Sequence, residues 1–176
     1  FIGSHLLCAL VGHGFDVTGV VREVGNHSEI RNPRFVGVGN LEEDIDWGPH
    51  LEGVDAVIHT AGLAHSKVIG ADASAKLTKV NVDATQKLLN SAVTAGVKRF
   101  VFISTIKVNG NSSSTQNPFS IHHKADPKDL YGLSKLEAEN AITDCCQKVS
   151  TAYTIIRPPL VYGKNLKGNL RWLEVA

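Results

Sequence analysis

The chain has 176 residues, of which 43% are hydrophobic and 20% charged, and this is too apolar for a disordered segment. The length favours one domain, and a net charge of +1 gives no indication of a nucleic-acid partner. No apolar run approaches the ~20 residues that span a bilayer, so we expect no membrane contact and no signal peptide. The three cysteines fit no metal or disulfide spacing, and we therefore expect no metal site, reduced thiols and a cytoplasmic location.

The predicted elements begin with a helix over residues 1–12, where apolar side chains recur at helical spacing until Gly12 and Gly14. Short strands are predicted at 16–22, 34–38 and 55–60, and the third is apolar on both faces, as buried parallel strands are. A helix over 78–95 and a strand over 99–104 follow. A long loop rich in Asn, Ser and Pro (109–128) then leads to a helix over 129–148 and a strand over 152–157.

The alternation of strands and helices predicts an α/β fold, with a doubly wound, mostly parallel sheet. In such folds, ligands bind in the crevice at the carboxyl ends of the strands. This architecture indicates a nucleotide or cofactor site but does not specify a reaction.

Tyr131 and Lys135 lie four residues apart in the helix predicted over 129–148, and therefore on one face. An ammonium beside a phenol favours the phenolate, so we expect Lys135 to lower the pKa of Tyr131 and make it a general acid/base. The spacing alone is weak evidence, because a Tyr and a Lys often stand four apart by chance. Ser104 and Thr105 follow a predicted strand, where hydroxyls face the crevice or simply cap the strand end.

Six motifs in order resemble the extended short-chain dehydrogenase/reductases, closest to nucleotide-sugar epimerases of the UDP-glucose 4-epimerase type. They are Phe1-Ile-Gly-Ser-His, His59-Thr-Ala-Gly-Leu, Asn81-Val, Ser104-Thr, Tyr131-x-x-x-Lys135 and Arg157-Pro-Pro-Leu-Val-Tyr-Gly. The segment from Phe102 to Gly110 resembles the same segment in the branch of this family that is found in bacterial polysaccharide biosynthesis. The resemblance implies one NAD(P)-binding Rossmann-type domain over 1–176. Because the family has a first strand before the position of Phe1 and a substrate-binding region beyond Ala176, we expect a chain truncated at both ends.

The resemblance assigns cofactor contacts along the chain. Backbone groups of Phe1 and Ile2 would meet the pyrophosphate, and Gly3 would allow close packing of helix and strand. The other implied cofactor contacts are Asn40, Leu41, Thr60, Ala61, Gly62, Leu63, Asn81, Tyr131, Lys135 and Pro159. Asn81 could instead be a helix cap or a buried polar contact.

The family's acidic ribose ligand falls at Val21, followed by Arg22. An acid there would repel a 2′-phosphate, whereas Arg22 could pair with one, so both NAD and NADP remain possible cofactors. Arg22 could equally be a solvated surface charge.

The resemblance implies that Thr105, Tyr131 and Lys135 are catalytic and that the substrate is a nucleotide sugar. In the implied reaction Tyr131 takes the proton of the sugar 4-hydroxyl, the cofactor accepts hydride from carbon 4, and the 4-keto sugar turns before hydride returns. The alternatives are an NADP-dependent reductase of a ketone or sugar intermediate, and a cofactor-binding module without catalysis. A 4,6-dehydratase is disfavoured because Ile106 and Lys107 replace the Asp-Glu of those relatives. A homodimer is possible.

Overall fold

The computed structural model describes residues 1–25, 34–64 and 72–163, and its contacts divide the chain into two compact units. One unit contains Phe1–Ile45 and the residues that follow Pro159, and the other contains Asp46–Pro159. Among the described residues, no helix has the length and apolar character needed to cross a membrane.

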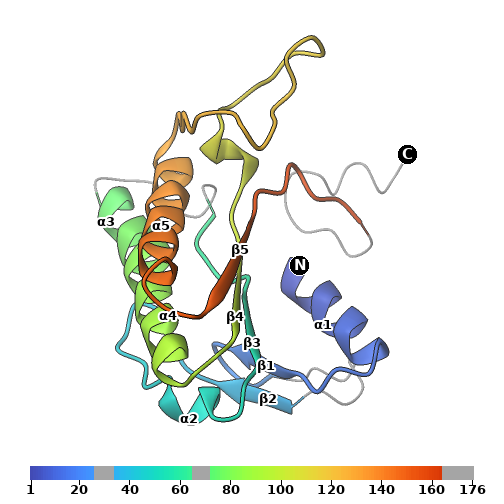
Figure 1. Cartoon of the computed structure of the whole chain (residues 1–176), viewed down its shortest axis with the longest axis vertical. Helices are drawn as coiled ribbons and strands as arrows, with labels where there is room; N and C mark the ends of the chain where they lie inside the picture. The colour runs from blue at the N-terminus through green and yellow to red at the C-terminus, as the bar shows by residue number, and fades with distance from the viewer. Residues whose placement is uncertain (26–33, 65–71, 164–176) are drawn as a thin grey trace. The chain divides into compact units, whose positions relative to one another are not determined.

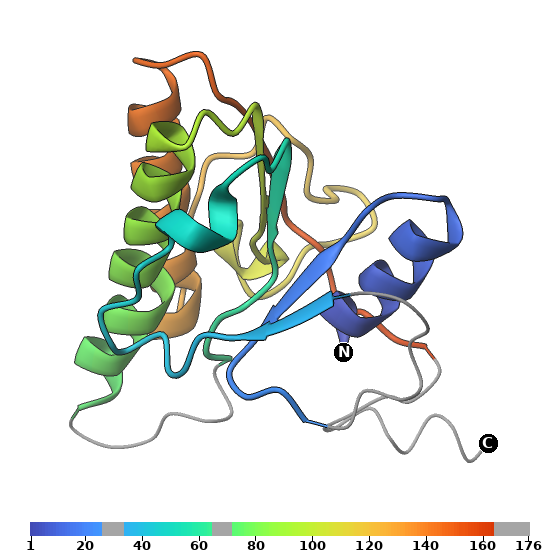
Figure 2. The same ribbon diagram turned by 90° about the horizontal axis from the view of Figure 1, so that it is seen from below.

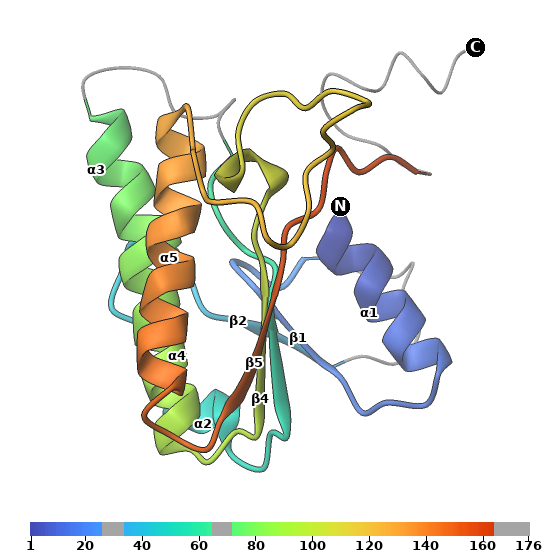
Figure 3. The same ribbon diagram turned by 45° about the horizontal axis from the view of Figure 1, so that its top comes forward.

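The larger unit is built on a three-stranded parallel sheet in the order β3-β4-β5. Its strands are β3 (Ala56–His59), β4 (Arg99–Ile103) and β5 (Ala152–Ile156). Alternate residues of β4 point to opposite faces, and Phe100 and Phe102 are fully buried on one of them. Helices α4 (Ala84–Thr94) and α5 (Leu130–Cys146) run side by side along one face of this sheet (Figures 1 and 3).

The helices bury apolar side chains at helical spacing. Leu88, Leu89 and Ala92 of α4 and Ala138 and Ile142 of α5 are almost inaccessible to solvent. The side chain of Asp129 caps α5 by accepting a hydrogen bond from Gly132 N at 2.7 Å. These features place the first turn of α5 at the end of the sheet where the strands finish (Figure 3).

Several elements differ from the sequence prediction. The helix predicted over 78–95 begins as a π-helix, η2 (Thr78–Asp83), and a short helix, α3 (Ala73–Leu77), precedes it. A second short helix, α2 (Gly48–Leu51), and a 3-10 turn, η3 (Ile106–Val108), were not predicted. Elements this short carry too few residues to show a periodic pattern.

The smaller unit pairs β1 (Thr18–Val21) with β2 (Arg34–Gly37) in parallel and contains helix α1 (Ile2–Gly12) (Figure 2). Gly19 of β1 is buried, and a Cβ atom there would lie 2.7 Å from Leu7 and 2.8 Å from Phe35. Glycine therefore lets α1 approach this sheet closely. All strand pairs of the described residues are parallel, and the predicted α/β architecture is confirmed.

Candidate active site

The candidate site lies where β3 and β4 end. Thr60, Ala61 and Gly62 follow β3, and Ser104 and Thr105 follow β4. Because the two strands are parallel and His59 pairs with Phe102, both segments leave the sheet at the same edge. The exposed segment 60–62 has small side chains, so a ligand could approach its backbone closely.

The structure brings the Thr105 hydroxyl close enough to the Tyr131 phenol to lower its pKa. Burial raises the pKa of the half-buried Tyr131, the Asp129 carboxylate raises it further, and the Thr105 hydrogen bond lowers it. The prediction that the pKa of Tyr131 is lowered is therefore wrong for this structure, because burial outweighs any nearby cation. The phenol is therefore neutral at physiological pH.

Lys135 lies one turn beyond Tyr131 on α5, and its side chain is buried with 3% exposure. Its Nζ atom lies 3.9 Å from the centroid of the Phe102 ring, a cation–π contact. Burial lowers the pKa of Lys135 to about 8, although the Glu139 carboxylate opposes this shift. The same Nζ atom would be 3.8 Å from a Cβ atom at Gly62, so the ammonium lies close to the segment after β3.

Asn81 fixes the segment that follows β3. Its Oδ1 accepts a hydrogen bond from Leu63 N at 2.8 Å, and its Nδ2 donates to Leu63 O at 3.1 Å and to Ser134 Oγ at 3.0 Å. A Cβ atom at Gly62 would lie 3.0 Å from Asn81 Oδ1. Asn81 sits in η2, and π-helical turns are frequent at functional sites. Its side chain is therefore a buried polar contact that shapes the site rather than a free ligand group.

The segment after β3 combines open backbone with a neighbouring positive charge. Gly62 leaves bare backbone at the strand end, and Lys135 supplies a buried cation directly beside it. Pro159 is exposed just beyond β5, and the carbonyl of its neighbour Pro158 accepts a hydrogen bond from Ile106 N at 2.9 Å. This contact holds the segment after β5 against η3.

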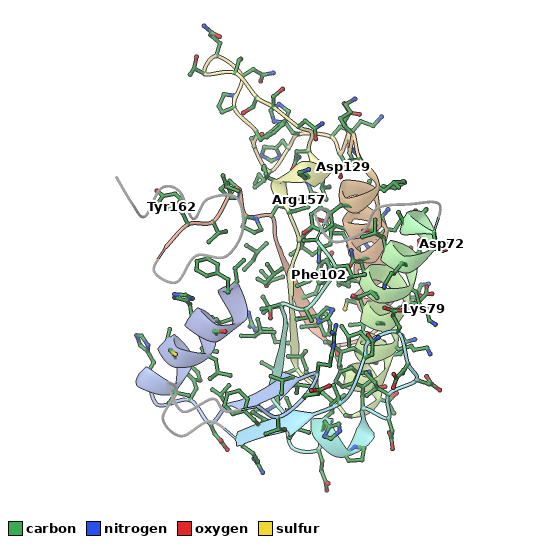
Figure 4. The ribbon with its side chains drawn as sticks, turned by 180° about the vertical axis from the view of Figure 1, so that it is seen from behind. Asp72, Lys79, Phe102, Asp129, Arg157 and Tyr162 are labelled. Atoms are coloured by element: carbon green, nitrogen blue, oxygen red, sulfur yellow. The ribbon has the colours of Figure 1, made fainter. Side chains whose placement is uncertain are left out.

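A buried polar network supports the site and was not predicted from the sequence. Glu139 accepts hydrogen bonds from Ser104 Oγ and from Arg157, whose Nη2 lies 2.5 Å from Oε2. Arg157 Nη1 also donates to Asn109 Oδ1 at 3.1 Å. Figure 4 labels Arg157 beside the turn of η3. The one signal in the sequence is that Tyr131, Lys135 and Glu139 recur every four residues.

His59 is a structural residue of the core. Its Nε2 atom lies 3.0 Å from Thr85 Oγ1, and its ring stacks on Phe102 with centroids 5.7 Å apart. Burial, with a smaller effect of the Lys135 charge, lowers the pKa of His59 to about 3. The ring is therefore neutral at physiological pH, and its Nε2 atom is engaged with the buried Thr85 hydroxyl.

The remaining predicted cofactor residues belong to the smaller unit. The carbonyl of Phe1 accepts a hydrogen bond from His5 N at 3.2 Å at the start of α1, where Ile2 and Gly3 follow. The Oδ1 atom of Asn40 accepts a hydrogen bond from Glu42 N at 3.3 Å and so closes a turn. Leu41 lies half-buried within this turn, and Arg22 is exposed directly after β1. The roles of these residues toward a cofactor stay predictions.

Comparison with known proteins matches nearly the whole chain to one family. Residues 1–173 match the model of the NAD dependent epimerase/dehydratase family. UDP-glucose 4-epimerase of Vibrio cholerae is 35% identical over 173 residues, which are 96% of this chain and 51% of that protein. The crystal structure of UDP-glucuronic acid 4-epimerase from Bacillus cereus in complex with NAD superposes with a TM-score of 0.78 at 27% identity, covering 93% of this chain and 55% of that one.

A short-chain dehydrogenase/reductase superfamily protein from Agrobacterium tumefaciens with bound NAD gives a TM-score of 0.76 at 29% identity, covering 89% of this chain and 45% of that one. The chain thus spans about half the length of the relatives it matches. The recognition of the short-chain dehydrogenase/reductase fold and of NAD as the cofactor of the family is confirmed. The chain belongs to the NAD-dependent epimerase/dehydratase family.

Proposed function

We propose that the protein epimerises carbon 4 of a nucleotide sugar, either UDP-glucose and UDP-galactose or the N-acetylated pair, with bound NAD. The observation that carries this proposal is the convergence of three groups at the carboxyl end of β4: the Thr105 hydroxyl, the Tyr131 phenol on which it acts, and the buried Lys135 one helical turn further along α5. The similarity to a UDP-glucose 4-epimerase supports the choice of reaction.

Three side chains have separate roles in the proposed chemistry. Tyr131 takes the proton of the sugar 4-hydroxyl and later returns it, and Thr105 orients the phenol and the reacting hydroxyl. Lys135 holds the cofactor at the segment after β3 and places a positive charge near the phenol. When bound, NAD supplies reversible acceptance of hydride, which oxidises carbon 4 to a ketone and restores it.

The neutral state of Tyr131 bears on the direction of proton transfer. A phenol whose pKa is raised by burial is protonated at neutral pH and can donate to the 4-keto oxygen. Proton abstraction needs the phenolate, which the interaction with Thr105 favours. The site therefore combines groups that act on each half of the reaction.

The test is interconversion of UDP-glucose and UDP-galactose by the protein with catalytic amounts of NAD. An epimerase forms product without net change in NADH absorbance, whereas stoichiometric consumption of NADPH would instead identify a reductase. We expect Tyr131→Phe to lower turnover at least about a hundredfold while NAD still binds. Tyr153→Phe is the matched control because Tyr153 is 38% exposed on β5. Unchanged turnover in Tyr131→Phe would reject the assignment.

A further inference from the structure

An ion pair joins the two segments that carry Thr105 and Tyr131. Lys107 Nζ lies 2.5 Å from Asp129 Oδ2, and the two side chains are 37% and 15% exposed. Lys107 stands two residues after Thr105, and Asp129 stands two residues before Tyr131. Figure 4 labels Asp129 at the start of α5, beside the turn of η3. The ion pair therefore lies next to the candidate site without being part of its hydrogen-bonded core.

Backbone contacts make this junction tight. Lys107 N donates a hydrogen bond to Thr105 Oγ1 at 3.3 Å, so the catalytic hydroxyl also caps η3. Asp129 Oδ1 accepts from Gly132 N at 2.7 Å, so one carboxylate both caps α5 and pairs with Lys107. A Cβ atom at Gly132 would lie 2.9 Å from the Lys107 carbonyl oxygen, which shows how closely the two turns approach.

The two charges of the pair have opposite signs beside one phenol. Burial makes the largest contribution to the raised pKa of Tyr131, and the Asp129 carboxylate is the next. Because Lys107 lies against Asp129, its ammonium offsets that carboxylate. Removing either charge breaks the same ion pair, yet the two removals change the potential at Tyr131 in opposite directions.

We propose that Lys107 and Asp129 are a positioning pair, which holds the Thr105 turn against the first turn of α5 and balances the charge beside the Tyr131 hydroxyl. The proposal rests on the proposed function only for the proton transfer that this balance serves. The placement of the phenol and its ionisation can be measured without any substrate.

Other charges surround the phenol at greater remove. The elements packed against α5 are α3, η2, α4, η3 and β5. Their charged groups, with those of α5, of the residues just before it and of the residue that follows β5, are Lys76, Lys79, Asp83, Lys87, Lys107, Asp126, Lys128, Lys135, Glu137, Glu139, Asp144 and Arg157. The carboxylate that acts on the Tyr131 pKa is that of Asp129. The substitutions below therefore change the dominant nearby charge and its partner.

The test compares Lys107→Gln with Asp129→Asn by titration of tyrosinate absorbance, with Tyr131→Phe subtracted to isolate one residue. Asparagine keeps an Oδ1 acceptor for Gly132 N, and Asp129→Ser provides a second uncharged cap. We expect Asp129→Asn to lower the Tyr131 pKa and Lys107→Gln to raise it. Lys107→Arg keeps the charge and should restore the titration of the unmodified protein.

A merely structural role predicts a different pattern. If the pair only held the two turns together, both neutral variants would shift the titration in the same direction, and this result would overturn the proposal. An unchanged titration in both variants would overturn it as well. The exposed pair of Lys98 and Asp55, at 2.7 Å, gives the matched controls Lys98→Gln and Asp55→Asn, which should leave the Tyr131 titration unchanged.

Kinetics supply the second readout. We expect Lys107→Gln to lower kcat/KM about threefold to tenfold at neutral pH. In a plot of kcat/KM against pH, the acidic limb should move to higher pH. Asp129→Asn should move that limb to lower pH. Opposite spectroscopic shifts in a protein without epimerase activity would support the pair and reject the proposed function, so the two failures are distinguishable.

Discussion

Arg157 provides the strongest test of the buried network, because it neutralises a carboxylate that is almost inaccessible to solvent. The Glu139 side chain is 4% exposed and that of Arg157 28% exposed. Three hydrogen bonds join them, from Arg157 Nε to both carboxylate oxygens at 3.0 and 3.1 Å and from Nη2 at 2.5 Å. In Arg157→Met, Glu139 would keep only the Ser104 hydroxyl of the partners described here.

The expected loss in the free energy of unfolding is that of removing one partner from a buried ion pair. Removing one partner of a buried ion pair costs about 3–5 kcal/mol, and the partial exposure of Arg157 places our expectation at the lower end, ~3 kcal/mol. With a typical urea dependence of about 1–3 kcal/mol per molar, the midpoint of unfolding should fall by roughly 1–3 M. Urea denaturation followed by circular dichroism measures this change.

Two comparisons decide whether the network acts as argued. The double variant Glu139→Leu with Arg157→Met should be more stable than Arg157→Met alone, because no unpaired carboxylate is left in the core. Lys98→Gln removes a cation from an ion pair whose side chains are 79% exposed, and it should leave the midpoint unchanged. Equal effects of Arg157→Met and Lys98→Gln would refute the reasoning.

Two further predictions concern α5. Because burial shifts the Lys135 pKa from 10.5 to about 8, the unfolded chain binds more protons than the folded chain between these pH values. The free energy of unfolding should therefore rise by ~3 kcal/mol as the pH rises across this window. Lys135→Met should lose that rise in denaturation experiments at pH 8 and 10. Gly132→Ala places a Cβ atom 2.9 Å from the Lys107 carbonyl and should lower both stability and turnover, whereas Leu133→Ala, at a side chain 43% exposed, should change neither to the same extent. Equal losses in the two alanine variants would contradict the tight junction.

The sequence predicted where the candidate side chains lie but not the contacts that support them. Helical spacing predicted that Tyr131 and Lys135 share a face, and the strand pattern placed Thr105 at a carboxyl end. The partners of Glu139 could not be predicted, because Ser104 is 35 residues away and Arg157 is 18 residues away in the chain. Contacts over such separations depend on how the strands order in the sheet, which local patterns do not encode.

The pKa of Tyr131 likewise could not be predicted from the sequence. Spacing along α5 predicted a cation near Tyr131, but the sign of its pKa shift depends on burial and on Asp129. The π-helical start of the segment after Leu77 was likewise invisible, since apolar residues at 3.6-residue spacing predict an α-helix. That turn carries Asn81, whose hydrogen bonds position Leu63 and Ser134.

The two halves of helix α5 differ in their roles: one half packs on the sheet, and the other carries the candidate site residues. Its C-terminal half buries Ala138, Ile142 and Cys146, and this apolar contact favours docking of the whole helix on the sheet. Its N-terminal half carries Lys135 and Tyr131, whose desolvation opposes that docking. Reactive groups are therefore held at the polar end of a helix that the other end anchors. Weakening the anchor should disturb the site before the fold is lost, because the polar end contributes least to stability.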